Sequence, residues 1–345
     1  MYVLRPICQK DLDAIYALAV EAEAGITTLP KNKSMLEERL GLAVASFFKE
    51  PNKPAGEDFW FVLEDLSDNR IVGSSAIFSK VGGFQPSYTY MVKTKKLKSD
   101  ALKVNREVEY LELYKNHDGP TELGSLFLSA KHRKGGIGRL LAMGRYAFMA
   151  QHPECFEDFV IAELRGRISK SGQSHFWDAI GKHFFGMEIL EADMMTLKDK
   201  SFIAELIPEY PIYIPLLPKA AQEAIGKVHP NTEPALRLLE QEGFRPTGEV
   251  DIFEGGPVLG CKFKSIRSIK QSQITPVRVS NDMQGEPLRL VSNVSELDNF
   301  RAMLTEAKEA DDGLVEISQS AFDTLRLAPN AQVCTTNPHF GKGKK

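Results

Sequence analysis

A glycine-containing segment near the middle of the chain has the composition of an anion-binding loop. Its sequence is RKGGIG, residues 133–138, and apolar runs lie directly before and after it. Between a strand and a helix, such a loop directs backbone N–H groups to one point at the helix N-terminus, where the helix dipole also favours an anion. The spacing R-x-x-G-x-G matches neither the Walker loop nor the dinucleotide-binding loop. The segment predicts a phosphate-binding turn, with an ordinary strand-to-helix connection as the alternative.

A histidine is the second candidate for chemistry. His229 lies in a loop ahead of a helix predicted at residues 232–242, and imidazole is the side chain that exchanges protons near neutral pH. A capping or solvated loop histidine is the alternative interpretation. The histidines at positions 132, 175 and 183 have no metal-ligand spacing with a nearby carboxylate or cysteine, so the sequence predicts no metal site.

The elements that must position these residues begin with a strand at residues 2–5 and a helix that starts at Asp11 and runs to about residue 24. A turn at residues 25–30 precedes a second helix, for which Ser34 and Glu37 form a capping box. Antiparallel hairpin strands are predicted at residues 59–64 and 71–79, and further strands at 88–93, 108–114 and 122–128, with a solvated lysine-rich connection at 94–103.

The second half of the chain alternates strands and helices. We predict strands at 158–164, 202–207, 249–253 and 258–263, and helices at 174–183, 218–226 and 232–242, the last closed by Gly243. Past residue 265 the chain is more polar, with a strand at 288–291, a helix near 297–308 and a strand-helix-strand unit at 314–334. This alternation predicts an α/β protein with a mixed sheet.

The same segments carry a resemblance to a known superfamily. The R-x-x-G-x-G loop after the strand ELGSLFL, and the opening VLRPICQKDLDAIYALA, resemble the GNAT acyl-CoA N-acyltransferases. The full pattern is similar to one family within that superfamily, arginine N-succinyltransferase. The segments that carry this likeness include GITTLP, FVLED, FWDAIGKHFFGM, FIAELIPEYPIY, IGKVHPNTEPALRLLEQEGF and DIFEGGP. The resemblance covers residues 3 to about 263.

The resemblance implies a GNAT-like fold and a division of the chain into three parts. Residues 1–165 would form the acyl-CoA-binding domain, residues 166–263 a second α/β portion with the histidine loop, and residues 264–345 a small accessory region containing β-structure. The implied substrates are succinyl-CoA and L-arginine. There are two alternative functions: transfer of the succinyl group to ornithine, or a role as a non-catalytic CoA-binding subunit of a two-chain complex. The family also implies a homo-oligomer or a hetero-oligomer with a similar chain.

Site residues follow from the same likeness. His229 matches the family's proposed proton-transfer residue, and Leu126 matches a position that contacts succinyl-CoA, through main-chain groups at a strand edge. Arg133 and the N–H groups of Gly136 and Gly138 are expected to hold the pyrophosphate. Two further acidic residues, Glu122 and Glu163, are candidates for binding the guanidinium or relaying a proton, with solvated strand ends as the alternative.

Composition excludes several classes of protein. The 345 residues are 43% hydrophobic and 26% charged with a net charge of -3, so neither disorder nor a dedicated nucleic-acid-binding surface is expected. No signal peptide or membrane span is evident, and four scattered cysteines without a C-x-x-C pair favour reduced thiols, so we expect a cytoplasmic protein. Cys155 or Cys261 could in principle carry an acyl group.

Overall fold

One long mixed sheet organises the molecule. The structure, a computed structural model, describes residues 1–22, 28–50, 52–83, 85–169, 172–196 and 199–338. Its strands follow one another across the sheet in the order β12-β15-β11-β14-β13-β1-β2-β3-β6-β7-β10-β9-β4-β5-β8. Most neighbouring pairs are antiparallel, whereas β6 and β7, like β11 and β14, run parallel. The mixed α/β fold class expected from the sequence is confirmed.

The strands and helices of the described chain have the following bounds. The strands are β1 (Tyr2–Pro6), β2 (Asp58–Asp65), β3 (Arg70–Phe78), β4 (Ser87–Ser99), β5 (Val104–Asn116), β6 (Thr121–Leu128), β7 (Phe159–Glu163), β8 (Ile212–Tyr213), β9 (Arg245–Asp251), β10 (Pro257–Lys262), β11 (Gln273–Val279), β12 (Leu288–Asn293), β13 (Ala302–Glu309), β14 (Val315–Ile317) and β15 (Gln332–Thr336). The helices are α1 (Leu12–Glu21), α2 (Lys33–Phe47), α3 (Ile137–Gln151), α4 (His175–Ala179), α5 (Gly181–Phe185), α6 (Ile189–Met195), α7 (Ser201–Leu206), α8 (Lys219–Ala224), α9 (Glu233–Glu242), α10 (Arg267–Gln271) and α11 (Gln319–Thr324).

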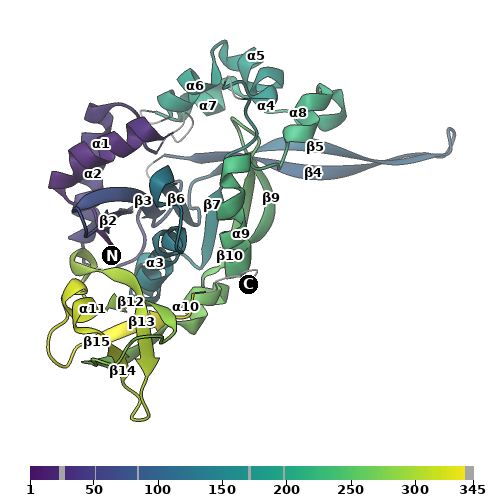
Figure 1. Cartoon of the computed structure of the whole chain (residues 1–345). Helices are drawn as coiled ribbons and strands as arrows, with labels where there is room; N and C mark the ends of the chain where they lie inside the picture. Colours follow the sequence, from purple (N-terminus) through teal and green to yellow (C-terminus); the bar gives the residue numbers. More distant parts are fainter. Residues whose placement is uncertain (23–27, 51, 84, 170–171, 197–198, 339–345) are drawn as a thin grey trace.

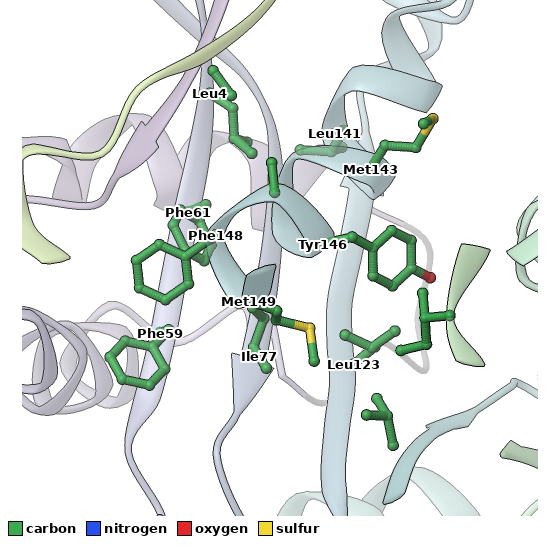
Figure 2. Close-up of a cluster of buried hydrophobic side chains, with 14 of the residues drawn as sticks. Leu4, Phe59, Phe61, Ile77, Leu123, Leu141, Met143, Tyr146, Phe148 and Met149 are labelled. Atoms are coloured by element: carbon green, nitrogen blue, oxygen red, sulfur yellow. The ribbon is translucent and has the colours of Figure 1, made fainter. Parts of the chain in front are cut away.

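The centre of the sheet is buried on both faces because its strands carry large apolar residues at consecutive positions. On β2, Trp60 and Val62 belong to an apolar cluster with α1 and α2, whereas Phe59 and Phe61 face the opposite cluster, which contains α3. Figure 2 shows the second of these, where Phe148 of α3 lies against Phe59 and Phe61. The alternation of strand side chains between two faces therefore fixes α3, and with it the glycine loop that precedes it.

Two more apolar clusters lie outside this centre. One joins β4 and β9 to the short helices α4–α8 through residues such as Tyr90, Phe176 and Trp177. The other consists of residues from Val277 to Val333 alone. The predicted division of the chain at residues 165 and 263 stays a proposal.

A two-stranded ribbon projects from the body. β4 and β5 are longer than predicted, and the lysine-rich stretch expected to be a solvated connection is part of this ribbon. β4 pairs with β9 only at Thr89–Met91, and β5 pairs with β8 only at Tyr110 and Leu111. In the described chain, the ribbon beyond these pairings is supported by no third strand.

Several sequence predictions are wrong in detail. α2 is capped by Asn32, whose side chain accepts the Met35 N–H, and not by a capping box at Ser34 and Glu37. Asp11 does precede α1, but its carboxylate pairs with Arg5 and caps nothing in that helix. Both Asn and Ser are good helix caps, so the choice between neighbouring candidates depends on backbone geometry that the sequence does not display.

Two elements differ in type from the prediction. Residues 202–207, predicted as a strand, lie mostly in α7, and residues 302–308, predicted as part of a helix, lie in β13. β13 has helix-favouring residues, yet it pairs with β1, β12 and β14, and this pairing overrides local propensity. The predicted helix at 174–183 is split into α4 and α5. Residues 25–27 of the predicted turn lie outside the described residues.

Candidate active site

The parallel strands β6 and β7 separate after a short paired stretch. They pair only at Thr121 with Val160 and at Glu122 with Ile161 within the described chain. On its other side β6 stays paired with β3 as far as Leu128. The separation therefore leaves one main-chain edge of β6 without a neighbouring strand, so that edge can bond an extended ligand.

A bulge lies within this open part of β6. Gly124 pairs with Ala76 and Phe127 with Ser74, so Ser125 and Leu126 together face Ser75. Ser125 has a φ of 51°, which turns the main chain locally. Leu126 is half-buried, and its side chain packs against the large apolar cluster that contains α3. Both the predicted main-chain role of Leu126 and simple packing fit this position.

The predicted phosphate-binding turn connects β6 to α3. Gly135 and Gly136 both have positive φ, 60° and 80°, and Gly136 is the residue at which α3 begins. The Ile137 N–H donates to the Lys134 carbonyl. In the described chain, the N–H groups of Gly136 and Gly138 donate to no backbone carbonyl, as expected at a helix N-terminus. The turn therefore directs two N–H groups outward at the positive end of α3.

Arg133 is tied to the end of β6. Its Nε donates to the Leu128 carbonyl at 2.9 Å, and its guanidinium lies 5.9 Å from the centre of the Phe127 ring. The residue is exposed. The predicted residues Arg133, Gly136 and Gly138 are thus brought together at the end of β6, which also carries Leu126.

The histidine loop is held against the end of β7. The His229 N–H donates to the Arg165 carbonyl at 2.8 Å, and the preceding Val228 forms an isolated bridge with Gly166. Nδ1 of His229 accepts the Asn231 N–H at 3.2 Å. Since Nδ1 is the acceptor, the proton of the neutral ring is assigned to Nε2. Val228 packs against the same apolar cluster as Leu126, so the histidine loop and β6 meet at one core.

Five carboxyl groups, which we name the acidic cluster, gather near this loop: Glu122, Glu163, Asp193, Asp251 and Glu254. Burial raises the pKa of Glu163 well above its ordinary value, and the charges of Glu122 and Asp251 raise it further. Burial, with the charges of Asp251 and Glu254, raises the pKa of Asp193 to about 8. Desolvation likewise raises the pKa of Glu122 and of Asp251. Carboxyl groups in this state bind a proton or a cation readily.

Two basic residues oppose the rise in pKa within the acidic cluster. Lys200 lowers the pKa of Glu122, Glu163 and Asp193, and Arg165 lowers that of Asp193, but burial outweighs both. A cavity of about 290 Å³ is lined by residues that include Gly226, Glu249 and Pro257, and the Glu249 charge also raises the pKa of Glu163. The site therefore combines an open strand edge, a glycine turn at a helix N-terminus, a histidine and a group of poorly solvated carboxyl groups with raised pKa values.

Part of this site was accessible to sequence reasoning. Glu122 and Glu163 were predicted as candidates, and the structure places both half-buried, which corrects the alternative of solvated strand ends. Asp193, Asp251 and Glu254 were missed. The segment DIFEGGP, which carries part of the family likeness, was the one available signal for Asp251 and Glu254.

Other predicted features have little support as catalytic groups. Cys155 and Cys261 are buried, and burial raises the pKa of the Cys155 thiol to about 12 and also raises that of Cys261. A thiolate that could carry an acyl group is therefore disfavoured.

The described ranges contain no group of three or more metal-ligating side chains. None of the described helices is both long and apolar enough to cross a membrane.

Comparison with known proteins identifies the chain as an acyltransferase. A family model described as "Arginine N-succinyltransferase beta subunit" matches residues 2–268. The chain belongs to the arginine N-succinyltransferase family.

Known relatives resemble the chain over nearly its whole length. It is 36% identical to "Arginine N-succinyltransferase subunit alpha" of Pseudomonas aeruginosa over 96% of this chain and 98% of the relative. It is 39% identical to "Arginine N-succinyltransferase" of Escherichia coli O6:H1 over 94% of each. The solved structure of arginine/ornithine succinyltransferase subunit AI from Pseudomonas aeruginosa matches with a TM-score of 0.89, 34% identity and 98% coverage of both chains.

Proposed function

We propose that this protein transfers the succinyl group of succinyl-CoA to the α-amine of L-arginine, giving N2-succinyl-L-arginine and CoA. The observation that supports this most directly is the acidic cluster beside the His229 loop, in a chain of the arginine N-succinyltransferase family. Arginine carries a permanent guanidinium charge, and desolvated carboxylates are its natural partners.

The donor would lie along β6. In this proposal, Arg133 and the N–H groups of Gly136 and Gly138 bind the CoA pyrophosphate at the N-terminus of α3. The amides of the pantetheine arm bond the open main-chain edge at Leu126, opposite the side that pairs with β3. The thioester then lies where β6 and β7 separate, close to the acidic cluster.

The reaction needs few protein groups. The neutral α-amine attacks the thioester carbonyl, the C–N bond forms, the C–S bond breaks, the nitrogen loses a proton and the CoA thiolate gains one. We assign His229 to this proton transfer as the donor, because Nδ1 accepts the Asn231 N–H and Nε2 carries the proton. Its Nε2–H protonates the departing thiolate, and the proton that the nitrogen loses passes through water and restores the neutral ring. The carboxyl groups of the acidic cluster other than Glu254, which binds Arg165 and Gly166, hold the guanidinium, so the α-amine is presented to the thioester.

The substrate test is CoA thiol release from succinyl-CoA and acetyl-CoA, each with and without arginine, ornithine and lysine. Arginine-dependent release from succinyl-CoA is the expected result. Ornithine-dependent release would support the second candidate acceptor, which the solved Pseudomonas aeruginosa relative carries in its name. Release with no pair, from a folded chain, would indicate a non-catalytic subunit.

The family also contains chains named as alpha and beta subunits. We propose that this chain works as an oligomer, either of identical copies or with a similar second chain. Light scattering on the purified chain should give a mass that is a multiple of 38.5 kDa. A monomer that needs a second chain for thiol release would favour the hetero-oligomer, whereas a fully active monomer would contradict the proposal.

A further inference from the structure

Three separate segments of chain meet behind His229. The Leu164 N–H donates to the Pro257 carbonyl at 3.1 Å, and the Gly226 N–H donates to the Gly255 carbonyl at 2.8 Å. The third connection is the bond from the His229 N–H to the Arg165 carbonyl. The end of β7, the segment 226–229 and the turn after β9 therefore hold one another in place.

The three segments approach more closely than side chains allow. A Cβ on Gly166 would lie 2.3 Å from the Glu254 carbonyl oxygen, and a Cβ on Gly256 would lie 1.9 Å from the Leu164 carbonyl oxygen. Each glycine is therefore required by backbone contact, because both neighbours are main-chain atoms that cannot rotate away. The position of the His229 main chain depends on this contact.

One charged side chain joins the turn to the end of β7. Glu254 is 9% exposed, and its Oε2 accepts the Gly166 N–H at 2.8 Å. Its Oε1 lies 3.4 Å from an Nη atom of Arg165, so the same carboxylate binds two successive residues. Those residues are the ones that bond His229 and Val228.

We infer that Glu254 is a positioning residue for His229, holding the histidine's main chain through the Arg165–Gly166 segment. This inference rests on the proposed role of His229. Burial raises the pKa of Glu254 to about 7, with Arg165 opposing the shift, which is consistent with a carboxylate fixed by its partners in a poorly solvated place.

The structure contains a matched control. Glu242 is 3% exposed, accepts the Ser268 N–H at 2.7 Å and lies 3.1 Å from an Nη atom of Arg267. It thus repeats the arrangement of Glu254: one buried carboxylate bonds an arginine and the N–H that follows. Glu242 ends α9 and holds α10, not the segments behind His229.

The test compares Glu254→Ala with Glu242→Ala. Both variants should lose thermal stability, because each leaves a half-buried arginine without its carboxylate partner. Only Glu254→Ala should lower kcat, by about 10–100-fold, with the KM for succinyl-CoA within about twofold. Glu254→Gln, which keeps an acceptor for the Gly166 N–H, should recover most of kcat. Equal kcat in the two alanine variants would overturn the inference.

A double variant shows whether the effect passes through the histidine. In a His229→Ala background, Glu254→Ala should lower kcat by less than about twofold, because the group it positions is already gone. An undiminished effect there would contradict the inference. If a Glu254→Ala chain does not fold, the cycle and the spectra use Glu254→Asp, whose shorter side chain withdraws the carboxylate from the Gly166 N–H.

A readout independent of turnover separates this inference from the proposed function. The imidazole resonances of His229 should shift in Glu254→Ala and not in Glu242→Ala. Should the wild-type chain show no thiol release, the proposed function fails while these resonances still test the positioning. Unshifted His229 resonances in Glu254→Ala would overturn it in either case.

Discussion

At the scale of single residues, His229 has a fixed main chain and a ring whose Nδ1 accepts a neighbouring N–H. This geometry assigns any proton exchange with substrate to Nε2. His229→Ala is therefore expected to lower kcat by about 10²–10⁴-fold, the usual range for removal of a positioned acid or base. The KM for succinyl-CoA should change little, because the donor is bound elsewhere.

Steady-state kinetics of thiol release provide the measurement. His183→Ala is the matched control, since His183 is exposed in α5 and is expected to leave kcat unchanged. An unaltered kcat in His229→Ala would remove this residue from the chemistry and leave the transferase proposal standing.

The acidic cluster predicts a proton linked to acceptor binding. Asp193, with a pKa raised to about 8, and Glu254, at about 7, hold part of their protons at pH 7. A guanidinium favours the charged carboxylates and lowers both pKa values, so binding must release protons at pH 7–8. Near pH 9.5 Asp193 and Glu254 are already ionised, and their share of the release should disappear.

Calorimetry with N-ethylguanidine in buffers of different ionisation enthalpy measures this release. The probe has no α-amine and stays charged throughout, so the released protons come from the protein. Asp193→Asn should reduce the release near pH 8. Proton uptake on binding, or a release that persists unchanged at pH 9.5, would contradict the assignment of the acidic cluster to the acceptor.

At the scale of elements, α3 contains two glycines with different surroundings. A Cβ on Gly138 would lie 3.8 Å from Leu128, an ordinary contact, whereas a Cβ on Gly144 would lie 2.2 Å from Leu4. Gly138→Ala should raise the free energy of unfolding by about 0.5–1 kcal/mol, because alanine favours the helix. It should also raise the KM for succinyl-CoA about 5–20-fold by crowding the pyrophosphate.

Gly144→Ala is the contrasting variant in the same helix. It should lower the free energy of unfolding by about 1–3 kcal/mol through overpacking and leave the KM unchanged. Thermal melts and donor titrations of both variants make the comparison. A Gly138→Ala chain that gains stability without any loss of donor affinity would show that the turn does not bind the pyrophosphate.

The sequence predicted elements best where local pattern and tertiary contact agree. The run from β6 through the glycine turn to α3 was predicted correctly, because a buried strand, positive-φ glycines and a buried helix each have a local signature. β13 was predicted as a helix, since its pairing with β1 comes from a residue about 300 positions away and that with β12 from residues 10 to 18 positions away. Only Glu122 and Glu163 of the five residues in the acidic cluster were predicted, for the same reason: Asp193, for example, reaches it from a separate helix.

At the scale of the whole molecule, the β4–β5 ribbon is the part that contributes least to any core. Residues 95–98 are exposed, and they pair in register with residues 105–108, from Lys95 opposite Val108 to Lys98 opposite Asn105. An isolated two-stranded hairpin is at best marginally stable in water. The base of the ribbon differs, because Tyr90 is 2% exposed and its ring lies 6.1 Å from that of Phe176.

Removing residues 95–98 together with 105–108 deletes four cross-strand pairs and keeps the pleat and the turn in register. The shortened chain should melt within about 3 °C of the wild type, because changes at exposed sites cost little stability. Tyr90→Ala, at the buried base, should instead cost about 3–5 kcal/mol. Two outcomes would contradict this expectation: a melting temperature as low as that of Tyr90→Ala, or a change in the number of chains per particle measured by light scattering. Either would mean that the outer ribbon is buried between chains in the assembled protein.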